Sequence, residues 1–173
     1  MDRVGVAKFY AGIGSRETPI TLEPIISQIV TELNSQEYTL RSGGADGADT
    51  LFEHHAIKKE IYLPWHGFNR NGSNLYTLTA KAFTLAEKYH PAWGRLSQAA
   101  KKLMARNCYQ ILGHDLKTPV DFVVCWTKDG KTGGTGQALR IAEDLNISVY
   151  NLYWQDDLLK LLDRIGPIYT DLW

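Results

Sequence analysis

Three glycine-rich segments constrain the fold of this chain more than any other feature of its sequence. Each follows a short apolar run and precedes a stretch in which apolar residues recur with helical spacing. The segments are Gly12–Arg16 (GIGSR), Ser42–Gly47 (SGGADG) and Gly133–Gly136 (GGTG). A strand, a tight glycine turn and a helix in this order are typical of a βαβ unit, so the pattern predicts an α/β fold with parallel strands.

The remaining elements alternate in the same way. Apolar runs predict strands at Val4–Ala11, Tyr38–Arg41, Glu60–Leu63, Asp121–Trp126 and Ile147–Leu152. Helical spacing predicts helices over 25–33, from about 50 to 59, over 76–88, over 97–112, from 133 to about 145, and over 158–165. We expect Thr18 or Thr21 to cap the first helix and Gly113 to end the fourth. The alternation predicts a Rossmann-like parallel sheet of about five strands in the order 3-2-1-4-5, with helices on both faces.

Length and charge limit the classes of function. A chain of 173 residues normally forms one hydrophobic core, so we expect a single nucleotide-binding domain over 1–173 with an aromatic-rich insert at about 65–95. Lys plus Arg and Asp plus Glu both number 19, and zero net charge disfavours non-specific DNA binding. No apolar run approaches the roughly 20 residues of a membrane span, and Cys108 and Cys125 form no C-x-x-C pair. We therefore expect a cytoplasmic protein with free thiols and no membrane partner.

The three glycine segments are expected to meet in space. Loops that follow parallel strands lie at the carboxyl edge of the sheet, and ligands bind there at the switch point between strands one and four. Glycine lets the backbone approach a ligand, helix N-termini attract anions, and Arg16 adds a planar cation suited to phosphate. The sequence therefore predicts a pocket for a phosphate-bearing, nucleotide-type ligand. The alternative is that these glycines serve only in turns and caps.

Other ligand classes are disfavoured. None of the segments matches the P-loop pattern of nucleotide triphosphatases. Glu17 occupies the third glycine position of a dinucleotide-binding G-x-G-x-x-G, so neither a classical oxidoreductase nor a resident cofactor is predicted. His54 and His55 are adjacent and point in different directions on a helix, so no metal site is expected.

Four motifs in this order resemble the SLOG superfamily, which unites the Smf/DprA DNA-processing proteins, the Lonely Guy nucleotide hydrolases and the YpsA-like proteins. The YpsA-like branch is the closest match. The matching pieces are the first two glycine segments, Arg106-Asn107, and the strand at 121–126 followed by GGTG, over about Lys8 to Leu152. The resemblance implies a Rossmann-like fold, nucleotide-type ligands and a homo-oligomer, most often a dimer.

The resemblance leaves the activity open. In Lonely Guy-type hydrolases the last loop reads G-G-x-G-T-x-x-E, and its glutamate helps to cleave the N-glycosidic bond. Here Arg140 takes the place of that glutamate and Gln137 that of the threonine. This favours a non-catalytic protein that senses or sequesters ADP-ribose or an NAD-derived signal, as related SLOG domains do in bacterial defence. The alternatives are a nucleotide N-glycosidase or phosphoribohydrolase, for which Asp49 and Glu53 are the carboxylates to test as general base, and a protein that binds single-stranded DNA.

The predicted ligand-binding residues come from the three loops and the Arg-Asn pair. They are Gly14, Ser15, Arg16, Ser42, Gly43, Gly44, Asp46, Asp49, Arg106, Asn107, Gly133, Gly134, Thr135 and Gly136. Trp65, directly after the third strand, is the predicted base-stacking residue, although such rings more often belong to a core or an interface. Asp46 and Asp49 have helix capping as their alternative role, and Asn107 a structural hydrogen bond.

Overall fold

The computed structural model describes residues 5–168 and contains a five-stranded parallel sheet. Its strands are β1 (Lys8–Gly14), β2 (Tyr38–Ser42), β3 (Lys59–Ile61), β4 (Phe122–Trp126) and β5 (Ser148–Asn151). They lie in the order β3-β2-β1-β4-β5, and every neighbouring pair is parallel. The predicted strand order and the Rossmann-like class are confirmed.

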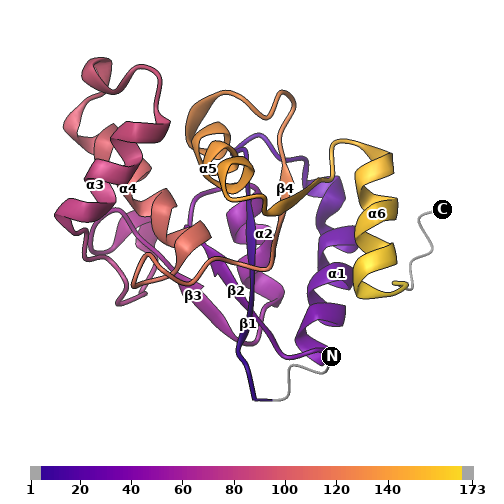
Figure 1. Ribbon diagram of the computed structural model, residues 1–173. Coiled ribbons are helices and arrows are strands. Elements are labelled where there is room, and N and C mark those ends of the chain that lie inside the picture. The colour runs from indigo at the N-terminus through magenta and orange to yellow at the C-terminus, as the bar shows by residue number, and fades with distance from the viewer. Residues whose placement is uncertain (1–4, 169–173) are drawn as a thin grey trace.

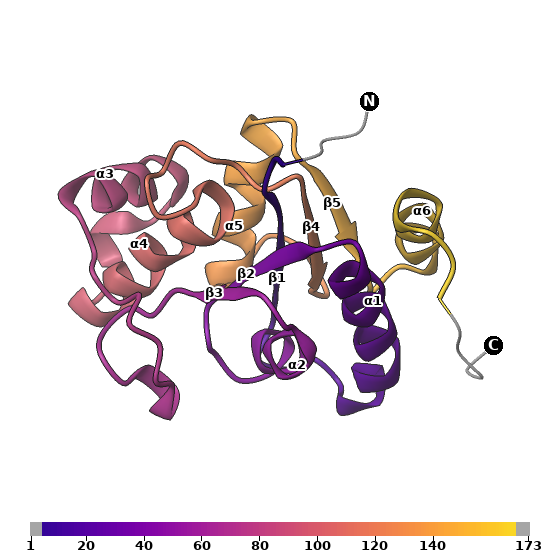
Figure 2. The same cartoon turned by 90° about the horizontal axis from the view of Figure 1, so that it is seen from below.

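Helices cover both faces of the sheet (Figure 1). The helices are α1 (Glu23–Ser35), α2 (Ala48–His55), α3 (Ala80–Tyr89), α4 (Gln98–Leu112), α5 (Gly133–Asp144) and α6 (Gln155–Ile165). Figure 2 shows α1, α2 and α6 on one side of the strands and α3, α4 and α5 on the other. Short 3-10 turns lie at Ile20–Leu22, Phe68–Arg70 and Trp93–Arg95.

The central strand β4 is buried on both faces, which explains why its sequence is an unbroken apolar run. Val124 and Trp126 contribute to the core under α1, α2 and α6, whereas Val123 and Cys125 contribute to the core under α3, α4 and α5. Every residue of β4 is buried. A strand covered on both faces shows no polar alternation, as expected for a parallel sheet.

Several predicted boundaries shift for identifiable reasons. Strand β1 begins at Lys8 and continues to Gly14, because Gly12, Ile13 and Gly14 pair with Val124–Trp126 of β4. Helix α2 ends at His55 instead of about Lys59, because Lys59 already pairs with Leu40 of β2.

The prediction that Thr18 or Thr21 caps the first helix is wrong. Helix α1 begins at Glu23 after a 3-10 turn, with Leu22 at its N-cap and no side-chain capping bond. The Thr18 hydroxyl instead donates to the Ser15 carbonyl at 2.6 Å and so stabilises the first glycine loop. Gly113 ends α4 as expected, with φ of 79°.

The sheet has its switch point between β1 and β4. The chain leaves β1 toward α1 on one face and leaves β4 toward α5 on the other, so the two loops diverge at the carboxyl edge. The Ser15 N–H donates to the Trp126 carbonyl at 2.9 Å and holds the bases of the two loops together. Open α/β sheets place a ligand crevice at such a point.

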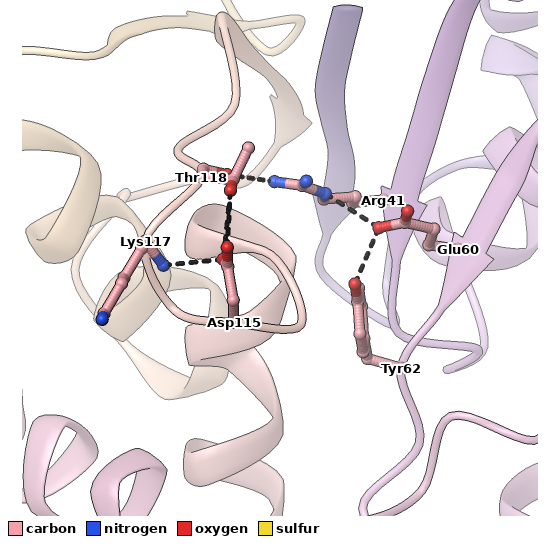
Figure 3. Close-up of polar contacts among 6 residues, drawn as sticks. All are labelled: Arg41, Glu60, Tyr62, Asp115, Lys117 and Thr118. Atoms are coloured by element: carbon pink, nitrogen blue, oxygen red, sulfur yellow. Dashed lines mark hydrogen bonds and ion pairs between the residues drawn. The ribbon is translucent and has the colours of Figure 1, made fainter. Parts of the chain in front are cut away.

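A buried cation ties the β2–β3 edge to the loop after α4 (Figure 3). Arg41, which is 2% exposed, donates to Glu60 Oε1 at 3.0 Å and to the Thr118 carbonyl at 2.5 Å. The Tyr62 hydroxyl donates to the same Glu60 oxygen at 2.7 Å, and Asp115 accepts from the Thr118 hydroxyl. The network fixes the far end of α4 against the sheet.

We predict that Glu60→Gln lowers the free energy of unfolding by about 1–2 kcal/mol, because the buried Arg41 guanidinium then loses its charged partner. The loss stays moderate because a third of the Glu60 side chain is exposed to solvent. Urea unfolding at pH 7 measures the change. Glu37→Gln is the control, since Glu37 is exposed and lies 3.9 Å from Lys58, and its loss is expected to stay below about 0.5 kcal/mol. Equal losses in the two variants would contradict the assigned role of Arg41.

Candidate functional site

A pocket of about 510 Å³ opens at the carboxyl edge where the loops after β1 and β4 diverge. We call it the main pocket. It is lined by Ile13, Gly14, Ser15, Arg16, Glu17, Ala45, Asp49, Leu103, Met104, Arg106, Asn107, Gln110, Thr127, Thr132, Gly133, Gly134 and Thr135. Most of the residues predicted to bind a ligand are therefore brought together, from the first and third glycine segments, from α2 and from α4, whereas the second glycine segment contributes only Ala45, which was not predicted.

The first turn of α5 forms one wall of the main pocket. Thr132 is the N-cap residue and its side chain makes no capping bond. Within residues 5–168, the N–H groups of Gly133, Gly134 and Thr135 have no hydrogen-bond acceptor, whereas the next one, on Gly136, donates to the Thr132 carbonyl. Three open N–H groups at the positive end of a helix dipole form a binding surface for an anion.

Arg16 adds an exposed positive charge to the same pocket. Its side chain is exposed, and it makes no hydrogen bond or ion pair with any other part of the described chain. A guanidinium without a structural partner can bind phosphate in a bidentate manner without breaking an existing contact.

Arg106 has a different role, because its guanidinium is buried. Its Nη1 donates to the carbonyls of Gly43 and Tyr62, the latter at 3.2 Å, and its Nε donates to Asn107 Oδ1 at 3.0 Å. Burial lowers the pKa of Arg106 to about 10, partly offset by the nearby Asp49, so the group stays charged at neutral pH. Arg106 therefore contributes positive charge to the pocket while it holds the loops after β2 and β3.

Asn107 links α4 to the first turn of α5. Its side-chain amide donates to the Gly134 carbonyl and to Gln137 Oε1, each at 3.1 Å. Asn107 thus makes the structural hydrogen bonds that were the alternative to ligand binding, and it also lines the pocket. Its contacts orient the α5 N–H groups toward the space that a ligand would fill.

Asp49 places a carboxyl group in the main pocket, close to Arg106. It is 4% exposed and accepts a hydrogen bond from the Ala45 N–H at 3.2 Å. Burial raises the pKa of Asp49 to about 6, against the opposing effects of Arg106 and of nearby hydrogen bonds. A carboxyl group in this position can accept a hydrogen bond from a ribose hydroxyl.

Three of the predicted residues form the wall behind the pocket and do not line it. The Ser42 hydroxyl is fully buried and donates to the Gly12 carbonyl at 2.6 Å. A Cβ atom on Gly43 would lie 2.7 Å from Arg106 Nη1, and one on Gly136 would collide with the Lys131 backbone. These glycines are required because neighbouring groups pack directly against their backbone.

Gly44, Asp46 and Glu53 lie in a second pocket of about 540 Å³. Its lining residues are Gly44, Asp46, Thr50, Glu53, His54, Lys59, Asn69, Arg70, Asn71 and Gly72. Glu53, named with Asp49 as a candidate general base, does not line the main pocket, because its carboxylate accepts from the Asn71 amide at 3.0 Å in this second pocket. Of these two candidate general bases, Asp49 is the one that lines the main pocket.

Trp65 lines neither pocket. Its ring is 37% exposed and packs edge-on against Phe68, with ring centroids 5.3 Å apart. The Phe68 ring lies 5.5 Å from the Arg106 guanidinium. Trp65 follows β3 at the carboxyl edge, but it packs against Phe68 and does not contribute to the pocket in which a base would lie.

The sequence reasoning missed Leu103 and Gln110 as pocket residues. Leu103 lies three positions before Arg106 on α4, and Gln110 lies four positions after it. Residues at this spacing share one face of a helix, so the position of Arg106 could have identified both. In the amide orientation that satisfies both groups, Gln110 Oε1 accepts from the Gly43 N–H at 3.2 Å. Gln110 thus supports the same loop that Arg106 holds.

The cysteines and acidic groups offer little other chemistry. Burial raises the pKa values of Cys108 and Cys125 to about 12, which keeps both thiols protonated and poorly nucleophilic. In the part of the chain that the structure describes, no three His, Cys, Asp or Glu side chains gather in a way that would bind a metal ion.

None of the helices between residues 5 and 168 has the length and apolar character needed to cross a membrane.

Comparison with known proteins identifies a shared fold. The chain superimposes on DNA processing protein A (DprA) from Helicobacter pylori with a TM-score of 0.53 and 18% sequence identity, over 91% of this chain and 72% of that one. That structure was described for its mode of binding single-stranded DNA. No family model matches the sequence, and no curated protein matches it significantly.

We predict that Asp49→Asn removes a pH dependence from the stability of the protein. A folded pKa of about 6 against 3.8 means that the carboxyl group contributes stability below pH 3.8, and that this contribution is lost as the pH rises through 6. The stability of the variant minus that of the wild type should therefore increase between pH 3.5 and 7.5 by on the order of 3 kcal/mol. Urea unfolding at several pH values measures this difference.

Asp129→Asn serves as the control with the opposite sign. The Lys131 and Thr132 N–H groups lower the pKa of Asp129, so its contribution is present above the unfolded pKa and is lost as the pH falls. A difference for Asp49→Asn that is flat with pH would show that this carboxyl group titrates normally.

Proposed function

We propose that the main pocket binds a phosphate-bearing, nucleotide-type ligand and holds it without cleaving it. The observation that carries this proposal is the meeting of three open α5 N–H groups with the unpaired Arg16 guanidinium in one pocket. Its volume of about 510 Å³ lies within the range of small-molecule sites. ADP-ribose or an NAD-derived signal is the favoured ligand class.

The polar groups of the pocket suit the parts of such a ligand. A phosphate on the α5 N–H groups would receive backbone hydrogen bonds and the fork of Arg16. Asp49, held within the same pocket, supplies an acceptor for a ribose hydroxyl. Leu103, which also lines the pocket, adds apolar surface for a base.

The contacts of Arg140 and Gln137 support a non-catalytic role. Arg140 donates to the carbonyls of Tyr89 at 2.8 Å and Lys131 at 2.9 Å, and Gln137 is buried with its amide nitrogen on the Ala86 carbonyl. Both side chains serve the packing of α5. The place where the Lonely Guy pattern has its glutamate is therefore filled by a structural arginine.

The resemblance in motifs supports a finer assignment. We propose that the chain is a SLOG-type protein of the YpsA-like branch, and that it forms a homodimer. The fold shared with DprA supports the SLOG superfamily, and the order of the motifs supports the YpsA-like branch. Light scattering coupled to size-exclusion chromatography tests the proposed homodimer, and a monomer at micromolar concentration would contradict it.

Isothermal titration of the protein with AMP, NAD and ADP-ribose tests ligand binding. We predict that Arg16→Ala weakens binding by about 10- to 100-fold, the range expected for the loss of charge-assisted hydrogen bonds, without a change in melting temperature. The matched control is Arg95→Ala, which removes an exposed arginine outside both pockets. Wild-type protein that binds none of the three compounds would refute the proposal.

Chromatography of the same mixtures after long incubation tests the absence of cleavage. Intact ligand is the expected result. Release of a free base or of nicotinamide would make the protein an N-glycosidase, and loss of that release in Asp49→Asn would identify Asp49 as the general base.

Single-stranded DNA is the second candidate ligand, favoured by the fold shared with DprA. The same pocket would then hold one backbone phosphate, and binding would weaken steeply as salt increases. Fluorescence anisotropy with a labelled oligothymidylate measures this. Binding of the oligonucleotide at 150 mM salt, with no binding of free nucleotides, would favour this alternative.

A further inference from the structure

The main pocket and the second pocket share a wall that is one loop thick. In the loop after β2, Ala45 lines the main pocket, whereas its neighbours Gly44 and Asp46 line the second. Asp49 and Glu53, four residues apart on α2, divide between the pockets in the same way. The two pockets therefore adjoin each other at residues 44–46.

The second pocket contains two cations that lack acidic partners. Lys59 donates to the Glu53 carbonyl at 3.1 Å, and neither Lys59 nor Arg70 forms an ion pair within residues 5–168. Both side chains are exposed to the pocket. An anionic group of a ligand would find both positive charges available.

The acidic groups of the same pocket are already oriented by amides. Asn69 Nδ2 donates to Asp46 Oδ1, and Asn71 Nδ2 donates to both Glu53 oxygens, each at 3.0 Å. A carboxylate has about four acceptor positions, so each retains capacity for further donors. The pocket thus combines hydroxyl acceptors with phosphate-binding cations.

The backbone that presents Arg70 is in an unusual conformation. Asn69 and Arg70 have φ values of 51° and 60°, in the left-handed region that residues other than glycine rarely adopt. Asn69 stabilises this conformation through its bonds to the Gly44 carbonyl at 2.9 Å and to Asp46. The wall between the pockets is therefore the same element that fixes Arg70 in place.

We infer that the second pocket binds the second ribose-phosphate unit of a ligand whose first unit lies in the main pocket. A ribose-phosphate unit needs both hydroxyl acceptors and cations, and the second pocket offers Asp46 and Glu53 for the former and Lys59 and Arg70 for the latter. The ligand class is then a dinucleotide-type molecule, with two ribose-phosphate units joined through their phosphates. This inference rests on the proposed function of the main pocket.

Titration calorimetry with AMP and ADP-ribose, which contain one and two such units, tests the inference. Wild-type protein should bind ADP-ribose at least about tenfold more tightly than AMP, because the second unit binds as part of an already anchored ligand. In Lys59→Gln/Arg70→Gln this advantage should fall below about threefold, while the affinity for AMP stays unchanged.

Lys58→Gln/Arg95→Gln is the matched control, because it removes the same charge from exposed positions outside both pockets. It should retain the advantage of ADP-ribose. AMP binding with no gain for ADP-ribose, or a gain that survives in Lys59→Gln/Arg70→Gln, overturns the inference and leaves the proposed function standing. Wild-type protein that binds neither compound overturns both.

Discussion

The buried Arg106 guanidinium is the interaction on which the carboxyl edge of this protein depends. A charge removed from water is tolerated only when hydrogen bonds and opposite charges compensate it. Arg106 meets this requirement with the Gly43 and Tyr62 carbonyls, the side chain of Asn107 and the field of Asp49. These partners come from the loops after β2 and β3, from α2 and from α4 itself, so one side chain fixes the relative positions of segments that are distant in sequence.

The sequence predicts the topology well because its signals are local. Glycine loops between apolar runs and helical stretches indicate parallel strands, and the order β3-β2-β1-β4-β5 follows from the usual connection rules. The boundaries were less predictable because pairing decides them. Gly12 and Gly14 look like a turn, yet they extend β1 because Val124 and Trp126 lie beside them.

The site was predictable in its location and less so in its details. Arg16, Asp49 and Gly134 line the main pocket, but Ser42 and Gly43 lie behind it and Asp46 beyond it. Which face of a loop meets solvent depends on what packs against the other face, here Arg106 and Gln110. That information is held in tertiary contacts that no spacing rule supplies. Zero net charge was similarly uninformative, because two arginines and a helix dipole converge on one side of a neutral molecule.

The glycine backbone that lines the main pocket also affects the conformational entropy lost when a ligand binds. Gly14 and Gly134 line the main pocket, and each packs so tightly that an added Cβ atom would meet the Trp126 carbonyl or the Asn107 amide. Walls made of backbone have no rotamers to lose when a ligand arrives, whereas long polar side chains each lose up to about 2 kcal/mol of conformational freedom on being ordered. Among the groups placed to contact a phosphate, Arg16 is the flexible one. The main pocket is therefore largely preorganised, and most of the ordering that it needs was completed when the chain folded.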